Sequence, residues 1–161
     1  MRSLLVPLLA LVFVGSAAAA QFTFTVTTAS PVNVATVTLN GVDQIQTFAI
    51  ANTVAYTGGN NNAGWNVQAS ATTPTSGLNT LPAIKVTAGT AVCQGTCTTA
   101  PTSSVTYPFA LSTTAVRVFN AAGNTGQGTF TVSNTYQVMY FANIFPGTYV
   151  STVTLTGSTG P

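Results

Sequence analysis

The chain has 161 residues, the size of a single domain. Only 2% of these residues are charged, against about 25% in an ordinary soluble protein. The charged side chains are Arg2, Asp43, Lys85 and Arg117, and the sequence contains neither histidine nor glutamate. General acid–base catalysis, a hard-cation site and a nucleic-acid surface each need several ionisable groups together. We therefore expect a protein that is not an enzyme, holds no cofactor or metal and binds no nucleic acid.

The low charge does not indicate disorder, because 46% of the residues are hydrophobic. Disordered chains combine low hydrophobicity with high net charge. Threonine occurs 31 times, and its β-branched side chain favours the pleated, half-buried surface of a sheet. The sequence thus predicts uncharged hydroxyl groups where most proteins carry lysine and glutamate.

The first twenty residues have the pattern of a secretory signal peptide. Arg2 supplies the positive start, residues 4–14 are apolar, and Ala18-Ala19-Ala20 offers a cleavage site before Gln21. An uncleaved anchor is the alternative, since the apolar run is just long enough for a marginal membrane span. The alanine-rich exit and the strand pattern that follows favour cleavage. We expect a domain over residues 21–161 that is secreted, lies at the cell surface and has no membrane contact after cleavage.

Taken in chain order, the segments after the leader alternate apolar and polar residues with a period of two. This pattern predicts strands, which we place over residues 21–28, 32–39, 44–50, 53–57, 65–71 and 116–118, over 84–86 and 91–92 on either side of Ala88-Gly89, over 130–132 leading into 136–142, and over 148–156. Glycine-, asparagine- and proline-rich stretches separate them, with residues 101–108 interpreted as a loop or an edge strand. Short strands at intervals of about ten residues predict an all-β, antiparallel β-sandwich, immunoglobulin-like or pilin-like, of about nine strands. A closed barrel is the alternative.

The phase of the alternation predicts which side chains face inward between the two sheets. Trp65 and Val67 share one phase of their segment, and the same argument selects the other members of the expected core. That core is Trp65, Val67, Phe130, Val132, Tyr149, Val153 and Leu155.

Cys93 and Cys97 enclose Gln-Gly-Thr. In an exported chain, so close a pair predicts a disulfide across a tight loop. A metal site needs about four ligands, and the sequence offers no others.

Two segments carry a family resemblance. One is Gly64-Trp65-Asn66-Val67-Gln68-Ala69-Ser70-Ala71, and the other is Pro146-Gly147-Thr148-Tyr149-Val150-Ser151-Thr152-Val153-Thr154-Leu155-Thr156. Together they resemble the WxL-type and related surface β-sandwich modules of exported bacterial proteins, and the second also resembles the end of pilus subunits and spore-coat-like proteins. The resemblance implies an extracellular structural or surface module.

Few side chains are candidates for a binding site. Asp43 follows a turn dipeptide and is expected to bond nearby backbone. Lys85 and Arg117 are expected to guard sheet edges, with an anionic glycan as the alternative partner. An aromatic platform for a sugar is the alternative to burial for Trp65, Tyr56, Tyr107 and Tyr140.

The sequence supports two functional hypotheses. A nearly uncharged protein with unguarded β-edges has little barrier to self-association, which predicts a pilus- or fibre-like homopolymer. The N-terminal segment 21–28, with Phe22, Phe24 and Val26 on one face, is a candidate donor strand for a neighbouring subunit, although it can equally pair within its own sandwich. The alternative is a module that binds cell-wall glycan or other carbohydrate.

Overall fold

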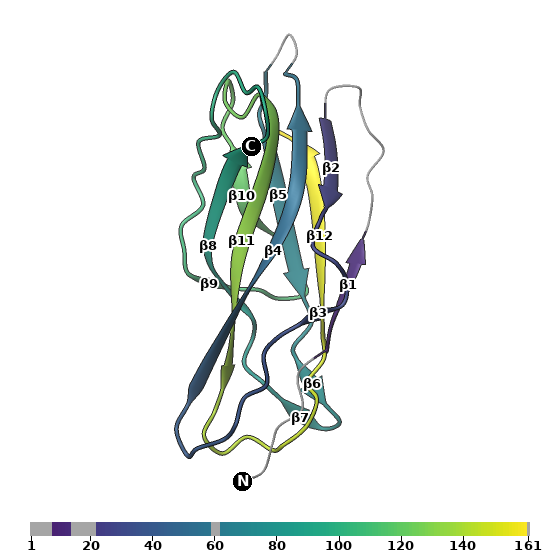
Figure 1. The fold of residues 1–161 in the computed structure, drawn as a ribbon, viewed down its shortest axis with the longest axis vertical. Helices are drawn as coiled ribbons and strands as arrows, with labels where there is room; N and C mark the ends of the chain where they lie inside the picture. Colours follow the sequence, from purple (N-terminus) through teal and green to yellow (C-terminus); the bar gives the residue numbers. More distant parts are fainter. Residues whose placement is uncertain (1–7, 14–21, 59–61, 161) are drawn as a thin grey trace.

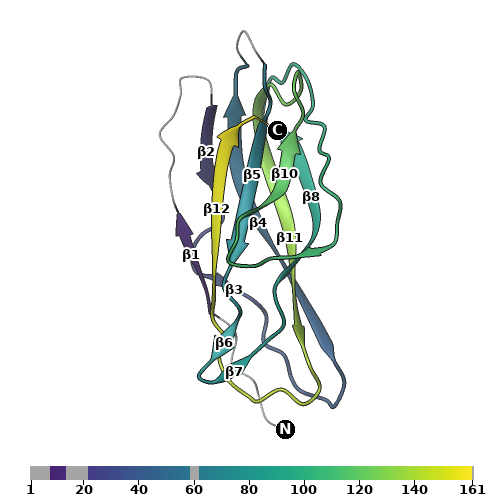
Figure 2. The ribbon, with the colours of Figure 1, turned by 180° about the vertical axis from the view of Figure 1, so that it is seen from behind.

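The computed structural model describes residues 8–13, 22–58 and 62–160, with the backbone alone for residues 8–13. These residues form an all-β structure in which two five-stranded sheets and a small two-stranded ribbon make a sandwich-like arrangement. Figures 1 and 2 show the two sheets lying face to face along the long axis of the molecule. The expected antiparallel β-sandwich is confirmed.

The first sheet is built around two long antiparallel strands that are far apart in the sequence. From one edge to the other it consists of β2 (Phe22–Val26), β4 (Gln44–Tyr56), β11 (Gly128–Tyr140), β8 (Lys85–Cys93) and β9 (Phe109–Ala110), all antiparallel to their neighbours. β4 and β11 pair without a break from Gly128 opposite Tyr56 to Tyr140 opposite Gln44. Their far ends extend past the other strands of the sheet (Figure 1).

The second sheet contains the C-terminal strand near its middle. Its order is β10 (Val116–Ala121), β5 (Trp65–Ala71), β12 (Ser151–Thr159), β1 (Leu8–Phe13) and β3 (Val32–Asn33). The pairing of β1 with β12 is parallel, whereas the other pairs are antiparallel. The small ribbon, β6 (Thr75–Ser76) with β7 (Asn79–Thr80), lies at the end of the molecule toward which β4 and β11 extend (Figure 2).

Several expected strand boundaries are wrong, and in each case tertiary pairing explains the difference. Segments 44–50 and 53–57 are one strand, because the thirteen-residue β4 pairs continuously with β11 through Asn52. The interruption expected near Ala88-Gly89 is likewise absent from β8. Cross-strand packing overrides the low strand propensity of asparagine and glycine.

Two other segments form less strand than expected. Segment 32–39 is a strand only at Val32–Asn33, and beyond it Val34 and Val37 are buried with a spacing of three rather than two. Residues 101–108 form no strand. This segment runs beside β10, where the side chain of Asn120 accepts hydrogen bonds from the Ser104 backbone nitrogen (2.9 Å) and the Ser103 hydroxyl (3.1 Å).

The core lies between the two sheets. All of the side chains expected to face inward are at most 1% exposed: Trp65, Val67, Phe130, Val132, Tyr149, Val153 and Leu155. The Trp65 ring is 5.9 Å from the Phe119 ring and donates from Nε1 to the Gly126 carbonyl (2.9 Å). Burial of the indole therefore leaves its polar atom satisfied.

The disulfide between Cys93 and Cys97 closes the end of β8, with Cα atoms 6.1 Å apart. The loop packs on Gly128, the first residue of β11, where an added Cβ would lie 2.8 Å from the Cys97 sulfur. Gly128 has a φ of +129°, which non-glycine residues rarely adopt. A glycine at this position thus lets the crosslinked loop lie flat against the sheet.

Tyr107 closes the sandwich where β8 and β10 face each other. Its hydroxyl donates to the Val118 carbonyl, which also accepts from Nδ2 of Asn134 at 2.9 Å. A Cβ added at Gly89 would collide with the Tyr107 hydroxyl and would lie 2.8 Å from the Asn134 amide nitrogen. Gly89 is therefore the space into which the tyrosine inserts.

This arrangement predicts that Gly89→Ala lowers the free energy of unfolding by about 1–3 kcal/mol through overpacking. Gly123→Ala is the matched control, because an added Cβ there meets only backbone oxygens at 3.6 and 4.0 Å. Urea unfolding monitored by Trp65 fluorescence measures both variants. Equal stability of the two would show that Tyr107 does not occupy the space above Gly89.

The buried tyrosines predict alkaline sensitivity. Burial raises the pKa of Tyr107 and of Tyr140 to about 12, and at Tyr107 a hydrogen bond with the Asn134 side chain partly opposes this rise in pKa. Burial, and to a lesser extent the charge of ionised Tyr107, raises the pKa of Tyr136. In the unfolded chain these phenols ionise near pH 10. Above pH 10 the unfolded chain therefore binds fewer protons, so the stability present below pH 10 falls as pH rises toward 12.

We expect tyrosinate absorbance to appear together with the loss of β-sheet circular dichroism in this pH window. Ionisation of all five tyrosines near pH 10 with the sheet signal intact would contradict the burial of these hydroxyls.

Candidate functional site

The expected donor strand lies within its own sandwich in the single chain. β2 pairs antiparallel with β4 from Phe22 opposite Tyr56 to Val26 opposite Asn52. Phe22 is buried, and the ring of Phe24 covers Gly157 of β12 so closely that an added Cβ would lie 2.6 Å from it. The three apolar side chains of segment 21–28 thus face inward along the seam between the sheets, with Phe24 and Val26 partly buried. This is the intramolecular alternative left open by the sequence, and it makes β2 an edge strand.

One of the two strands that pair with β12 is β1, which belongs to the segment expected to be the leader. β1 pairs with β12 in parallel from Leu9 opposite Ser151 to Phe13 opposite Leu155, and it pairs with β3 at Leu8 and Leu9. β1 therefore fills the position between β12 and β3 (Figure 1). The expected cleavage site after Ala20, and the rest of the leader, lie outside the described residues.

Loss of β1 would leave the backbone of β12 unpaired along one edge. The backbone of an unpaired strand must find other hydrogen-bond partners, and the inward face of β12 in the paired stretch consists of Ser151, Val153 and Leu155, all buried. Its outward face carries Thr152 and Thr154. This stretch of β12 is the candidate functional site, which we name the β12 edge.

Among the residues described with side chains, the charged ones are Asp43, Lys85 and Arg117, and none belongs to β12, β1 or β3. Asp43 accepts a hydrogen bond from the Ala142 backbone nitrogen (2.8 Å), 99 residues away in the sequence, instead of from the nearby backbone that the sequence predicted. Charges protect edge strands against pairing with other chains, and the β12 edge has no such protection.

Asn52 presents a buried amide within the first sheet. It lies on β4 opposite Val26 of β2 and Val132 of β11 and is fully buried, and within the described part of the chain neither of its side-chain polar atoms has a hydrogen-bond partner. An unsatisfied buried polar group costs about 1–3 kcal/mol. The sequence pattern did not predict the burial of Asn52, because asparagine is depleted in strands and indicates an interruption.

We predict that Asn52→Leu raises the free energy of unfolding by about 1 kcal/mol or leaves it unchanged, since it removes an unsatisfied amide. Asn134→Leu is the matched control, because the Asn134 amide donates to Val118 and its loss leaves a carbonyl with one partner fewer. Chemical denaturation of the two variants tests the difference. A loss of stability by Asn52→Leu as large as that of Asn134→Leu would show that the Asn52 amide is satisfied in solution.

The aromatic residues do not form an exposed platform. Trp65, Tyr56 and Tyr140 are at most 4% exposed, and Tyr107 is half-buried, with its hydroxyl bonded to the Val118 carbonyl. These rings belong to the core or to its closure.

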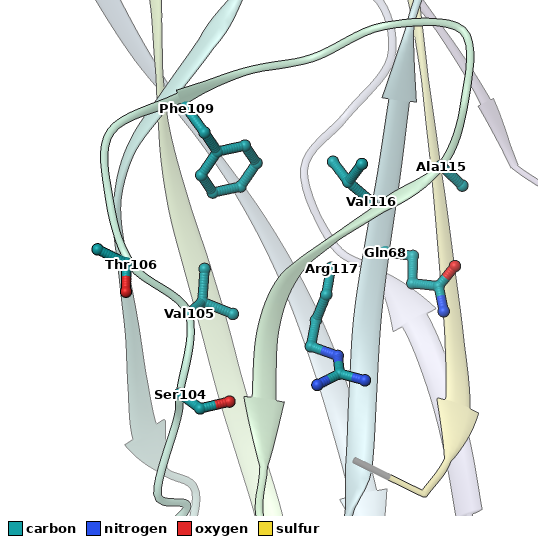
Figure 3. A pocket seen from close by; sticks show the side chains of 8 residues that line it. All are labelled: Gln68, Ser104, Val105, Thr106, Phe109, Ala115, Val116 and Arg117. Carbon is teal, nitrogen blue, oxygen red and sulfur yellow. The ribbon is translucent and has the colours of Figure 1, made fainter.

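A separate hollow of about 450 Å³ lies where β10 and β5 of the second sheet meet residues 104–106 and β9 of the first sheet. Arg117 and Gln68, which are direct cross-strand partners on β10 and β5, form its floor. Figure 3 shows the Arg117 side chain between Gln68 and the 104–106 segment. The remaining lining residues are Ser104, Val105, Thr106, Phe109, Ala115 and Val116. Lys85 is not part of this hollow and lies on β8 of the other sheet.

Comparison of the chain with protein-family models, with curated proteins and with solved structures finds no match. Within the part of the chain that the structure describes, no helix has the length and apolarity needed to span a membrane. The functional argument therefore rests on the geometry of the chain itself.

Proposed function

We propose that the protein is a secreted, non-enzymatic structural subunit that self-assembles at the cell surface into a pilus- or fibre-like homopolymer by strand exchange. One observation carries the proposal: the strand that completes the sheet beside β12 belongs to the segment that the sequence pattern marks as a removable leader. A mature subunit without that segment would need another strand at the β12 edge.

The β12 edge suits a strand from a second copy of the chain. Main-chain hydrogen bonds along an open edge supply affinity, and alternating side chains that enter the core supply register. Along the paired stretch, the inward positions of β12 are two residues apart, at Ser151, Val153 and Leu155. A donor with apolar side chains at every second residue matches this spacing.

The N-terminal segment 21–28 has the required pattern and position. Phe22, Phe24 and Val26 alternate with threonines, and β2 is an edge strand held by one neighbour, β4. Terminal edge strands are among the segments most easily released from a domain. Donation from one subunit to the next is heterologous, so the contact propagates into an open filament instead of closing as a dimer.

Exposed apolar side chains at one end of the molecule also favour association. Val42, Ile45, Phe141 and Phe145 are between 41% and 65% exposed around the extended ends of β4 and β11. Clusters of exposed apolar residues mark interaction surfaces, and a nearly uncharged surface provides little electrostatic repulsion between copies.

Deletion of residues 22–28 tests the proposal. We expect the secreted wild-type chain to form filaments in negative-stain electron micrographs and the deletion variant to form none. The variant is expected to bind a synthetic peptide of residues 21–28.

A peptide of the same composition with the alternation inverted, so that threonines occupy the positions of Phe22, Phe24 and Val26, is the matched control and is expected not to bind. Filaments formed by the deletion variant would refute N-terminal donation, and a wild-type chain that stays dispersed would refute self-assembly.

A further inference from the structure

We infer that the hollow around Arg117 binds an acidic saccharide, with the Arg117 guanidinium on a uronate-type carboxylate and the sugar ring against the apolar wall. The inference is independent of self-assembly, because the residues that line the hollow belong to β10, β5, β9 and the 101–108 and 111–115 segments, and none of them belongs to β12, β1 or β2.

The charge of Arg117 has no acidic partner in the hollow. None of the lining residues is acidic, and Asp43, the one acidic side chain in the sequence, is engaged with Ala142 beyond the start of β4. A guanidinium offers a planar fork of donors that matches a carboxylate, and charge-assisted bonds of this kind are stronger than neutral ones. A ligand carboxylate at Arg117 would therefore meet no competing acidic side chain among the residues that line the hollow.

The neighbouring polar groups are uncharged and suit hydroxyl groups. Nε2 of Gln68 donates to Oδ1 of Asn66 (3.1 Å), so its second N–H is left to donate to a ligand hydroxyl, whereas the Gln68 carbonyl oxygen points away from Arg117 (Figure 3). The Ser104 hydroxyl donates to the Asn120 side chain (3.3 Å), so its oxygen remains able to accept. Thr106 adds another hydroxyl to the rim.

The opposite wall is apolar and fixed in place. Phe109 stacks on Tyr107 with ring centroids 5.8 Å apart, and Tyr107 is itself anchored to Val118. Val105 and Val116 complete this wall. Small-molecule sites combine an apolar lining with a few placed polar groups in about 300–1,000 Å³, a range that includes this hollow.

One cation among neutral hydrogen-bonding groups favours a sugar acid over a polyanion. A nucleic acid or a polyglutamate chain is recognised by several cations, whereas a uronate offers one carboxylate with several hydroxyls per ring. The one positive charge of the hollow thus matches the one carboxylate of a single acidic sugar residue.

Binding of fluorescently labelled oligogalacturonate to the purified full chain tests the inference. Wild-type protein is expected to bind the acid and to bind its methyl ester at least about tenfold more weakly, because the ester lacks the charge that Arg117 recognises. Arg117→Gln is expected to weaken binding of the acid by about tenfold or more. Arg117→Lys keeps the charge but not the planar pair of donors, so its affinity for the acid is expected to lie between those of the wild type and Arg117→Gln.

Lys85→Gln is the matched control, because it removes the same charge from an exposed position on the other sheet. It is expected to leave the affinity unchanged. Gln68→Glu places a carboxylate directly opposite Arg117 and is expected to abolish binding while the cross-strand ion pair keeps the sheet folded.

Equal losses from Arg117→Gln and Lys85→Gln, equal binding of acid and ester, or equally tight Arg117-dependent binding of polyglutamate would each overturn the inference. Filament formation by Arg117→Gln is expected to match that of the wild type, so failure of the saccharide site and failure of the assembly proposal are distinguishable.

Discussion

A strand inside a sheet must satisfy backbone hydrogen-bonding groups along both of its edges, and the structure depends most on how β12 meets this requirement. One edge pairs with β5 from Val153 opposite Ala71 to Thr159 opposite Trp65, and the other pairs with β1. The same strand contributes Val153 and Leu155 to the core. The strand beside β12 therefore decides whether the backbone of this core strand is paired on both sides.

Charged side chains are few, and among the described residues the loops are attached to the sheets by hydrogen bonds between uncharged groups. Short hydroxyl and amide side chains attach loops to the sheets: the Ser151 hydroxyl donates to the Thr72 carbonyl (2.5 Å), and the Thr72 hydroxyl accepts from the Thr152 backbone nitrogen (2.9 Å). Asn120 attaches the 101–108 segment in the same way. Such bonds add local order without adding charge, so copies of the chain meet little electrostatic repulsion. The same scarcity makes Arg117 conspicuous, since no acidic group accompanies it.

Much of the fold follows from the alternation of side chains along the sequence. The sheet class, the inward-facing core and the pairing of the two nearby cysteines depend on residues that are neighbours in the chain, so local patterns are sufficient to predict them. The errors occur at residues whose character is set by distant partners. The sequence predicts an interruption of the strand at Gly89, but this glycine lies within β8 and makes room for Tyr107. The sequence also predicts an interruption at Asn52, but β4 pairs with β11 on both sides of this residue. The candidate sites show the same limit, because nothing in the sequence joins Arg117 to Gln68 or Leu9 to Ser151.

By itself, the sequence determined that this protein is a nearly uncharged chain, and its pattern predicted a strand-rich fold after a leader-like start. Composition and a period of two are local properties, and they need no knowledge of which strands meet. Only the tertiary structure decided that β2 pairs with β4, that β1 lies beside β12, and that Arg117 lines a hollow with Phe109. These pairings join residues up to 142 positions apart, as in Leu9 with Ser151. They are selected by backbone hydrogen bonding and packing between segments, which alternation within any one segment does not encode.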